Sequence, residues 1–264
     1  MPIPTDDWNS RFEAIEVISD TKDLHKIFSQ LQLPPLENEE IHFLKKYVKV
    51  MQPFVTALDI LNDAGSFRGV LLPTILSIKC RLEAMSALEY GDGLRVQALR
   101  GLNERFGMLN ILSEQGFPFL IATISHPAFK MSCLPLELQN SARELFLDAC
   151  LTLSDRYSPK TDENKKTDSF FSVLKSPKPS VDCTTNEALR YLTDVSEDLP
   201  MLHRYPCVKS IFLKYNTCLS SSGPVEKLFA ACRQVFSENK PTGISDGLFE
   251  DYLLIKVSNS QVIR

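Results

Sequence analysis

The chain has 264 residues, a net charge of −4 and an apolar fraction of 44%. This length allows one large or two small domains, and the apolar fraction is that of an ordinary globular protein, so a buried core is expected. The acidic balance argues against a stand-alone DNA-binding surface, which usually carries a basic patch. The sequence contains no run of about 18 apolar residues, so no membrane-spanning helix is predicted.

Amphipathic helices are predicted along most of the first 156 residues. Residues 38–53 are typical of a helix, with Asn38 as its cap, glutamates in its first turn and Pro53 limiting its end. Apolar residues recur at helical spacing in three further ranges, which are 70–88, 94–111 and 137–153. Because each helix has one apolar face, these residues are expected to form a mainly α bundle.

One segment in this region admits two structures. Residues 117–124 are short, apolar and rich in aromatic side chains, which favours a strand. Prolines flank the segment, however, and a buried helical turn fits the pattern equally well.

The composition changes at residues 157–186, where Ser, Lys, Asp, Thr and Pro dominate. Such a segment cannot bury enough apolar surface to fold, so we predict a flexible linker. Helical patterns then return at 187–193, 205–216, 224–237 and 246–258. The predicted organisation is therefore a helical bundle (1–156), a linker (157–186) and a C-terminal helical region (187–260).

Cysteine and histidine positions predict no metal site and no cofactor. The seven cysteines lie far apart without a Cys-x-x-Cys pair, which indicates small core residues in a reducing compartment, either cytosol or nucleus. The four histidines, expected to be surface or hydrogen-bonded residues, are His25, His42, His126 and His203. Glycine-rich loops that could cradle a phosphate are absent from the sequence.

A serine-rich motif precedes a predicted helix near the C-terminus. Gly223 can cap this helix, and Pro224 suits its first position. Glu226 then falls at the third position, where the helix dipole and unpaired N–H groups favour a carboxylate. A structural role explains this glutamate without any catalysis.

Several motifs resemble those of hAT-superfamily transposases. Residues 220–229, Ser-Ser-Ser-Gly-Pro-Val-Glu-Lys-Leu-Phe, are similar to the C-terminal signature of that family. Residues 8–12, Trp-Asn-Ser-Arg-Phe, resemble the motif that opens the family's helical insertion. Further similar segments follow in the family's order at 50–58, 70–75, 120–130 and 248–256, and the last resembles the final helix of the dimerisation region.

The resemblance implies a fold and an expected loss of activity. The implied fold is a helical bundle of the hAT insertion type, a linker, and C-terminal helices of the RNase H-like dimerisation region. In the family the Glu226 position completes an Asp-Asp-Glu metal site whose aspartates lie before the Trp-Asn-Ser motif; here only Asp6 and Asp7 precede it, and they adjoin it. Two-metal catalysis needs several converging carboxylates, so we expect no catalytic residue and no enzymatic activity. The family's BED-type zinc finger would also lie upstream, and the chain could be complete or truncated.

The expected function is therefore that of a domesticated, transposase-derived protein that acts through dimerisation. The resemblance implies a homodimer, or a heterodimer with related hAT-derived proteins, and favours the nucleus over the cytoplasm. The predicted interface residues are Leu228, Phe229, Cys232, Phe236, Phe249, Tyr252 and Leu253. Three alternatives stay open: these side chains pack on the 1–156 bundle, the chain regulates a full-length relative at DNA, or it is a generic helical scaffold.

Overall fold

The structure is a computed structural model that describes most of the chain. The described residues are 8–63, 65–85, 91–107, 111–157 and 181–223, together with Val225, Glu226, Phe229, Gly247, Glu250, Asp251, Leu254 and Ile255. Helices dominate these ranges, so the prediction of a mainly α protein is confirmed. The β-type pairing within them is an isolated antiparallel bridge between Phe67 and Leu219.

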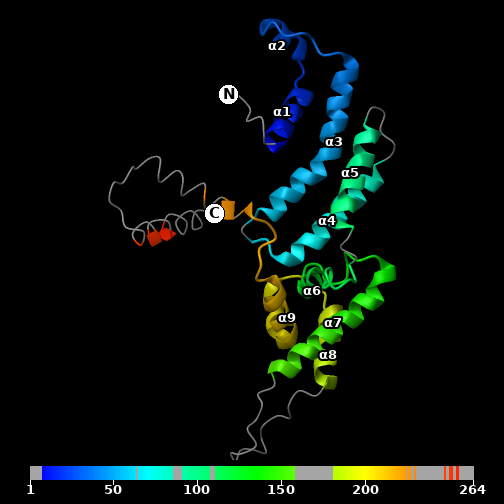
Figure 1. The fold of residues 1–264 in the computed structure, drawn as a ribbon, viewed down its shortest axis with the longest axis vertical. Coiled ribbons are helices and arrows are strands. Elements are labelled where there is room, and N and C mark those ends of the chain that lie inside the picture. The colour runs from blue at the N-terminus through cyan, green and yellow to red at the C-terminus, as the bar shows by residue number, and fades with distance from the viewer. Residues whose placement is uncertain are drawn as a thin grey trace, which may run out of the picture.

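The first helices form one end of the molecule (Figure 1). In chain order they are α1 (Trp8–Asp20), α2 (Leu24–Gln30), α3 (Asn38–Leu61), the 3-10 helix η1 (Arg68–Val70), α4 (Leu71–Ala84) and α5 (Asp92–Phe106). Helix α1 packs against α3 and buries Phe12. Helices α3, α4 and α5 share a small core, made of Val50, Ala57, Ile78, Leu82 and Leu102.

Helix α3 continues past the end that Pro53 predicts. Pro53 lies inside the helix and is buried, although a proline in a helix interior removes a backbone hydrogen bond and costs about 3 kcal/mol. Val50 and Ala57, on either side of it, are buried in the core shared with α4 and α5, and this burial offsets the cost. The predicted cap is also wrong, because Asn38 is already helical and the N–H of Glu37 donates to the Glu40 carboxylate at 2.8 Å.

Other predicted boundaries shift by a few residues. The sequence pattern extends two helices to residues 88 and 111, but α4 ends at Ala84 and α5 ends at Phe106. The segment that admitted two structures is helical and forms α6 (Phe117–Ser125). Pro118 lies in its first turn, where a missing N–H leaves no helical hydrogen bond unmade.

The other end of the molecule contains α6 and the helices that follow it (Figure 1). These are α7 (Leu136–Tyr157), α8 (Val181–Thr193), the 3-10 helix η3 (Leu199–Arg204) and α9 (Pro206–Asn216). Their apolar faces meet in a second, larger core, whose fully buried side chains include Ile121, Phe146, Tyr191 and Ile211. The rings of Phe146 and Tyr191 lie 6.1 Å apart between centroids and join α7 to α8.

This larger core draws on helices from both sides of the predicted linker. Residues 181–186, which their polar composition places in the linker, belong to α8, and Tyr157 belongs to α7. Helices α8 and α9, expected in a separate C-terminal region, pack on α6 and α7. Composition can indicate which segment lies outside a core, but it cannot indicate which core the helices after that segment pack into. The expected boundary therefore does not separate two cores.

A buried polar cluster joins the two ends of the molecule. The Gly69 N–H donates to Oδ1 of Asn216 at 2.8 Å, and the Thr123 hydroxyl donates to the Gly69 carbonyl at 2.9 Å. Nδ2 of Asn216 donates to the Ala122 carbonyl at 3.1 Å and to the Ser125 hydroxyl at 3.2 Å. A Cβ on residue 69 would lie 2.6 Å from both the Ala122 carbonyl oxygen and Oδ1 of Asn216, so only glycine fits.

Candidate functional site

The serine-rich motif lies against the C-terminal end of α3. The Ser221 hydroxyl donates to the Leu61 carbonyl at 2.8 Å and lies 2.9 Å from Oδ1 of Asn62. The Ser220 hydroxyl reaches the same Leu61 carbonyl at 3.1 Å and lies 2.6 Å from the hydroxyl of Ser66. The last carbonyls of a helix have no partner within it, and the motif supplies partners from a distant part of the chain. Its serines therefore have a structural role that the sequence reading missed.

Glu226 lies in the first turn of the helical segment after this motif. Gly223 is already helical, so the segment begins one residue before the predicted start. The Glu226 N–H donates to the Ser222 carbonyl at 2.9 Å, and the Ser222 hydroxyl donates to the Glu226 carboxylate at 2.6 Å. The side chain is otherwise exposed. This arrangement supports the structural reading of Glu226, because a carboxylate near a helix N-terminus is stabilised by the helix dipole.

The anchoring of the serine motif can be measured directly. We expect the double variant Ser220→Ala/Ser221→Ala to lower the free energy of unfolding by about 2 kcal/mol, because each hydroxyl donates one hydrogen bond and the loss of one bond typically costs about 1 kcal/mol. Urea denaturation followed by circular dichroism measures the change. Ser222→Ala removes an exposed hydroxyl and should cost less than about 0.5 kcal/mol. Equal losses in the two variants would contradict the anchoring role.

Metal-ligating side chains do not gather in the described part of the chain. Among the described residues, no three His, Cys, Asp or Glu side chains lie close enough to hold a metal ion. Asp6 and Asp7, which precede the Trp-Asn-Ser motif, lie outside those residues.

Of the seven predicted interface residues, the structure describes one, Phe229. Phe229 is 59% exposed. Six further predicted residues lie outside the described part of the chain, namely Leu228, Cys232, Phe236, Phe249, Tyr252 and Leu253. Three other apolar side chains, absent from the predicted set, are exposed nearby in sequence: Val225 (43%), Leu254 (60%) and Ile255 (61%). In Figure 1 the described residues between Val225 and Ile255 lie to one side of the two groups of helices, α1–α5 and α6–α9.

A buried lysine fastens the loop after α6 to the loop after α8. Lys130 has a φ of 46°, in the left-handed region, and is 9% exposed. Its Nζ donates to the carbonyls of Asp194 and Ser196, the latter at 2.8 Å, and lies 5.4 Å from the centre of the Tyr191 ring. Burial lowers the pKa of Lys130, and the negative charge of Asp194 opposes that shift. The contacts of Lys130 therefore stabilise the packing of these two loops.

The Asp194 carboxylate accepts two hydrogen bonds and forms an ion pair with Arg204. The Ser196 N–H donates at 2.9 Å, the Tyr205 hydroxyl at 2.8 Å, and an Arg204 guanidinium nitrogen lies 3.1 Å from the same carboxylate. Led by the Ser196 backbone bond, these donors lower the pKa of Asp194 to about 2. The loop between α8 and η3 is therefore held by an ionised carboxylate.

This pKa predicts a specific loss of stability in acid. A carboxyl whose folded pKa is depressed stabilises the fold fully above its ordinary pKa, near 3.8, and loses that contribution as the pH falls through about 2. We expect the wild-type chain to lose more stability than Asp194→Asn between pH 5 and pH 2.5, as measured by urea denaturation at about those pH values. Ser141→Ala, an exposed change on α7 that removes no titratable group, should keep the wild-type slope. Parallel curves for wild type and Asp194→Asn would contradict this role.

The expectation that the cysteines are core residues holds for Cys150 but is wrong for Cys80, Cys183 and Cys218, which are exposed. His25, His42 and His203 are exposed, as expected, while His126 is half-buried with its ring centroid 5.0 Å from that of Phe129. Burial lowers the pKa of His126. The cysteines within the described residues are free thiols, and burial raises the pKa of Cys133 to about 11, which disfavours its reactive thiolate form.

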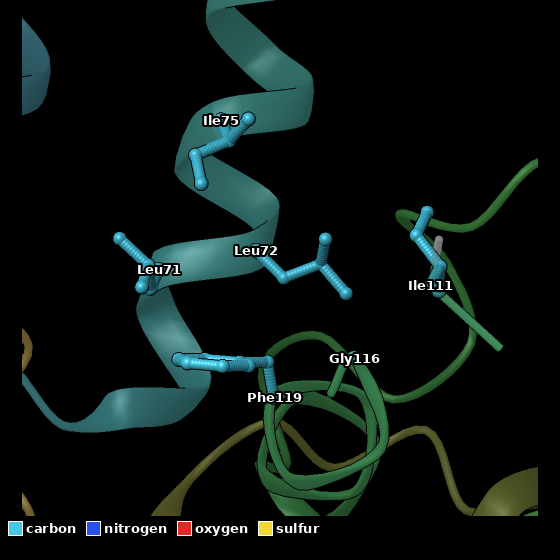
Figure 2. Close-up of a pocket in the computed structure, with 6 residues that line it drawn as sticks. All are labelled: Leu71, Leu72, Ile75, Ile111, Gly116 and Phe119. Carbon is cyan, nitrogen blue, oxygen red and sulfur yellow. The ribbon is translucent and has the colours of Figure 1, made fainter. Parts of the chain in front are cut away.

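A cavity at the joint between the two ends is too small for a ligand. It encloses about 10 Å³ and is apolar on all sides (Figure 2). The side chains and backbone that line it come from α4 and from the chain around the start of α6: Leu71, Leu72, Ile75, Ile111, Gly116 and Phe119. Pockets for small molecules typically have volumes of about 300–1,000 Å³. This cavity is therefore a small gap in the packing between α4 and α6.

Comparison of the chain with protein-family models and with curated proteins found no match. In the part of the chain that the structure describes, no helix is both long enough and apolar enough to cross a membrane.

Proposed function

We propose that this chain is a transposase-derived protein that works by self-association, without catalysis, through its C-terminal segment, residues 223–255. One observation carries the proposal. Every apolar side chain of this segment that the structure describes is exposed, namely Val225, Phe229, Leu254 and Ile255. Single exposed apolar residues are normal, but several on one segment that stands beside the body indicate a surface that binds another protein (Figure 1).

The gain from covering these side chains is large enough for a dimer. Burying an exposed Val, Leu, Ile or Phe contributes about 1.5–3 kcal/mol, and these four are about half exposed, which leaves about 3–6 kcal/mol per chain. A two-fold symmetric dimer uses each surface twice, which doubles the gain to about 6–12 kcal/mol. The entropy of association costs at least about 4 kcal/mol, so the upper end of this gain corresponds to a dissociation constant in the range of about 1–100 μM.

The resemblance to hAT transposases also supports the C-terminal segment as the dimer interface. Residues 248–256 are similar to the last helix of the family's dimerisation region, and 220–229 are similar to its C-terminal signature. In the proposed role Glu226 stabilises a helix start through Ser222 and takes no part in chemistry. The partner is a second copy of this chain, and a related hAT-derived protein with the same segment would fit by the same contacts.

A single charged substitution tests the proposal. Phe229→Asp should convert the dimer to a monomer, because it places a carboxylate in an apolar contact, and sedimentation velocity at micromolar concentration measures the change. Leu136→Asp is the matched control, since Leu136 is 82% exposed at the start of α7, where an acidic residue suits the helix dipole. Dissociation of both variants, or of neither, would count against the C-terminal segment.

A further inference from the structure

A groove runs along the surface between α3 and α4. It consists of two adjoining cavities of about 180 Å³ and 600 Å³, which share Pro53, Thr56 and Arg81 in their walls. On α3 the walls extend from Lys45 to Ile60, which at 1.5 Å per residue is about 22 Å, or four helical turns. The groove is therefore long enough to hold a short helix.

The two halves of the groove differ in chemistry. The larger cavity is lined by Lys45, Lys49 and Arg81, all exposed and without an ion pair among the described residues. No acidic side chain lines either cavity. The smaller cavity is mainly apolar, with Ile60 and Ile78 in its walls. A matching ligand would have acidic groups at one end and apolar groups at the other.

The C-terminal segment has this pattern. Glu250 and Asp251 are helical and exposed, and Leu254 and Ile255 follow one turn later, also exposed. Four residues of helix advance by about 6 Å. On α4, Arg81 and Ile78 are likewise about one turn apart, so an acidic residue beside Arg81 places the next turn's apolar residue beside Ile78.

From this complementarity we infer that the groove between α3 and α4 binds the segment 247–255 of a second copy of the chain, with Glu250 and Asp251 facing Lys49 and Arg81. The inference rests on the proposed function and names the surface that receives the segment. Within one chain, this segment stands apart from α3 and α4, so the groove of each copy is open to the other (Figure 1). Reciprocal exchange of the segment gives a closed dimer.

Charge reversal on each side tests the inference with the full-length chain. The groove variant is Lys49→Glu/Arg81→Glu, and the segment variant is Glu250→Lys/Asp251→Lys. Like charges then face each other, and each variant alone should dimerise at least about tenfold more weakly than wild type in sedimentation velocity. A one-to-one mixture of the two variants should restore the dimer, because every groove in the mixed dimer again meets a segment of opposite charge. Arg105→Glu/Arg143→Glu, at exposed positions outside the groove, should dimerise as wild type does.

The outcomes separate this inference from the proposed function. A groove variant that dimerises normally, while Phe229→Asp does not, overturns the groove and leaves self-association standing. A mixture that stays monomeric also overturns the groove. A strictly monomeric wild-type chain overturns the proposed function and the groove with it. Loss of binding to a short DNA duplex in the groove variant, with dimerisation intact, would overturn the groove as a dimer contact and assign Lys49 and Arg81 to phosphate binding.

Discussion

Phe146→Ala is expected to lower the free energy of unfolding by about 3–5 kcal/mol, the loss typical of deleting a buried aromatic ring. Phe146 is fully buried in the larger core, where α7 packs against α8 and its ring lies beside that of Tyr191. The surrounding helices cannot fill the space that the ring leaves, so a cavity adds to the lost transfer free energy. Urea denaturation followed by circular dichroism measures the effect.

The same variant tests whether α8 and α9 belong to the main fold. Since the core joins α6 and α7 to helices beyond residue 180, α9 should unfold in the same transition as α7. Leu136→Ala, which truncates an 82% exposed side chain on α7, is the control and should change stability by less than about 0.5 kcal/mol. A loss below about 1 kcal/mol in Phe146→Ala would contradict the shared core.

Asn216→Ala should cost about 2–4 kcal/mol. Its side chain is 2% exposed and bonds the Gly69 N–H, the Ala122 carbonyl and the Ser125 hydroxyl. Truncation leaves these buried groups without their partner, and each unsatisfied group costs about 1–3 kcal/mol. Because this cluster joins η1 to α6 and α9, the variant also weakens the joint between the two ends of the molecule.

The matched control for Asn216 is Asn140→Ala. Asn140 is exposed on α7, so its replacement by a better helix former should leave the free energy of unfolding within about 0.5 kcal/mol of wild type. Similar losses in both variants would show that the buried cluster contributes nothing particular.

Helical periodicity was enough to predict most helices, because local spacing determines which face of a helix is apolar. The rule that a proline ends a helix failed at Pro53, where burial of Val50 and Ala57 outweighs the local cost of a proline. Periodicity could not assign α8 and α9 to the core of α6 and α7, since the partner of an apolar face depends on contacts between residues distant in sequence.

The candidate site was predicted in part. Local rules predict Glu226 at a helix start, and the structure places it there with Ser222. The bonds from Ser220 and Ser221 to the end of α3 were not predictable, because nothing in either local sequence indicates that the two segments meet. Asn216 gave no signal either, since a buried asparagine and an exposed one look alike in a single sequence.

The most direct measurement of the central claim is the mass of the unaltered full-length chain in solution. Light scattering on a size-exclusion column, at loading concentrations from about 1 to 100 μM, covers the expected dissociation constant. Self-association through the C-terminal segment predicts a mass that rises toward twice that of one chain, and that stays at one chain for Phe229→Asp. A mass of one chain for the wild type at every concentration would contradict it.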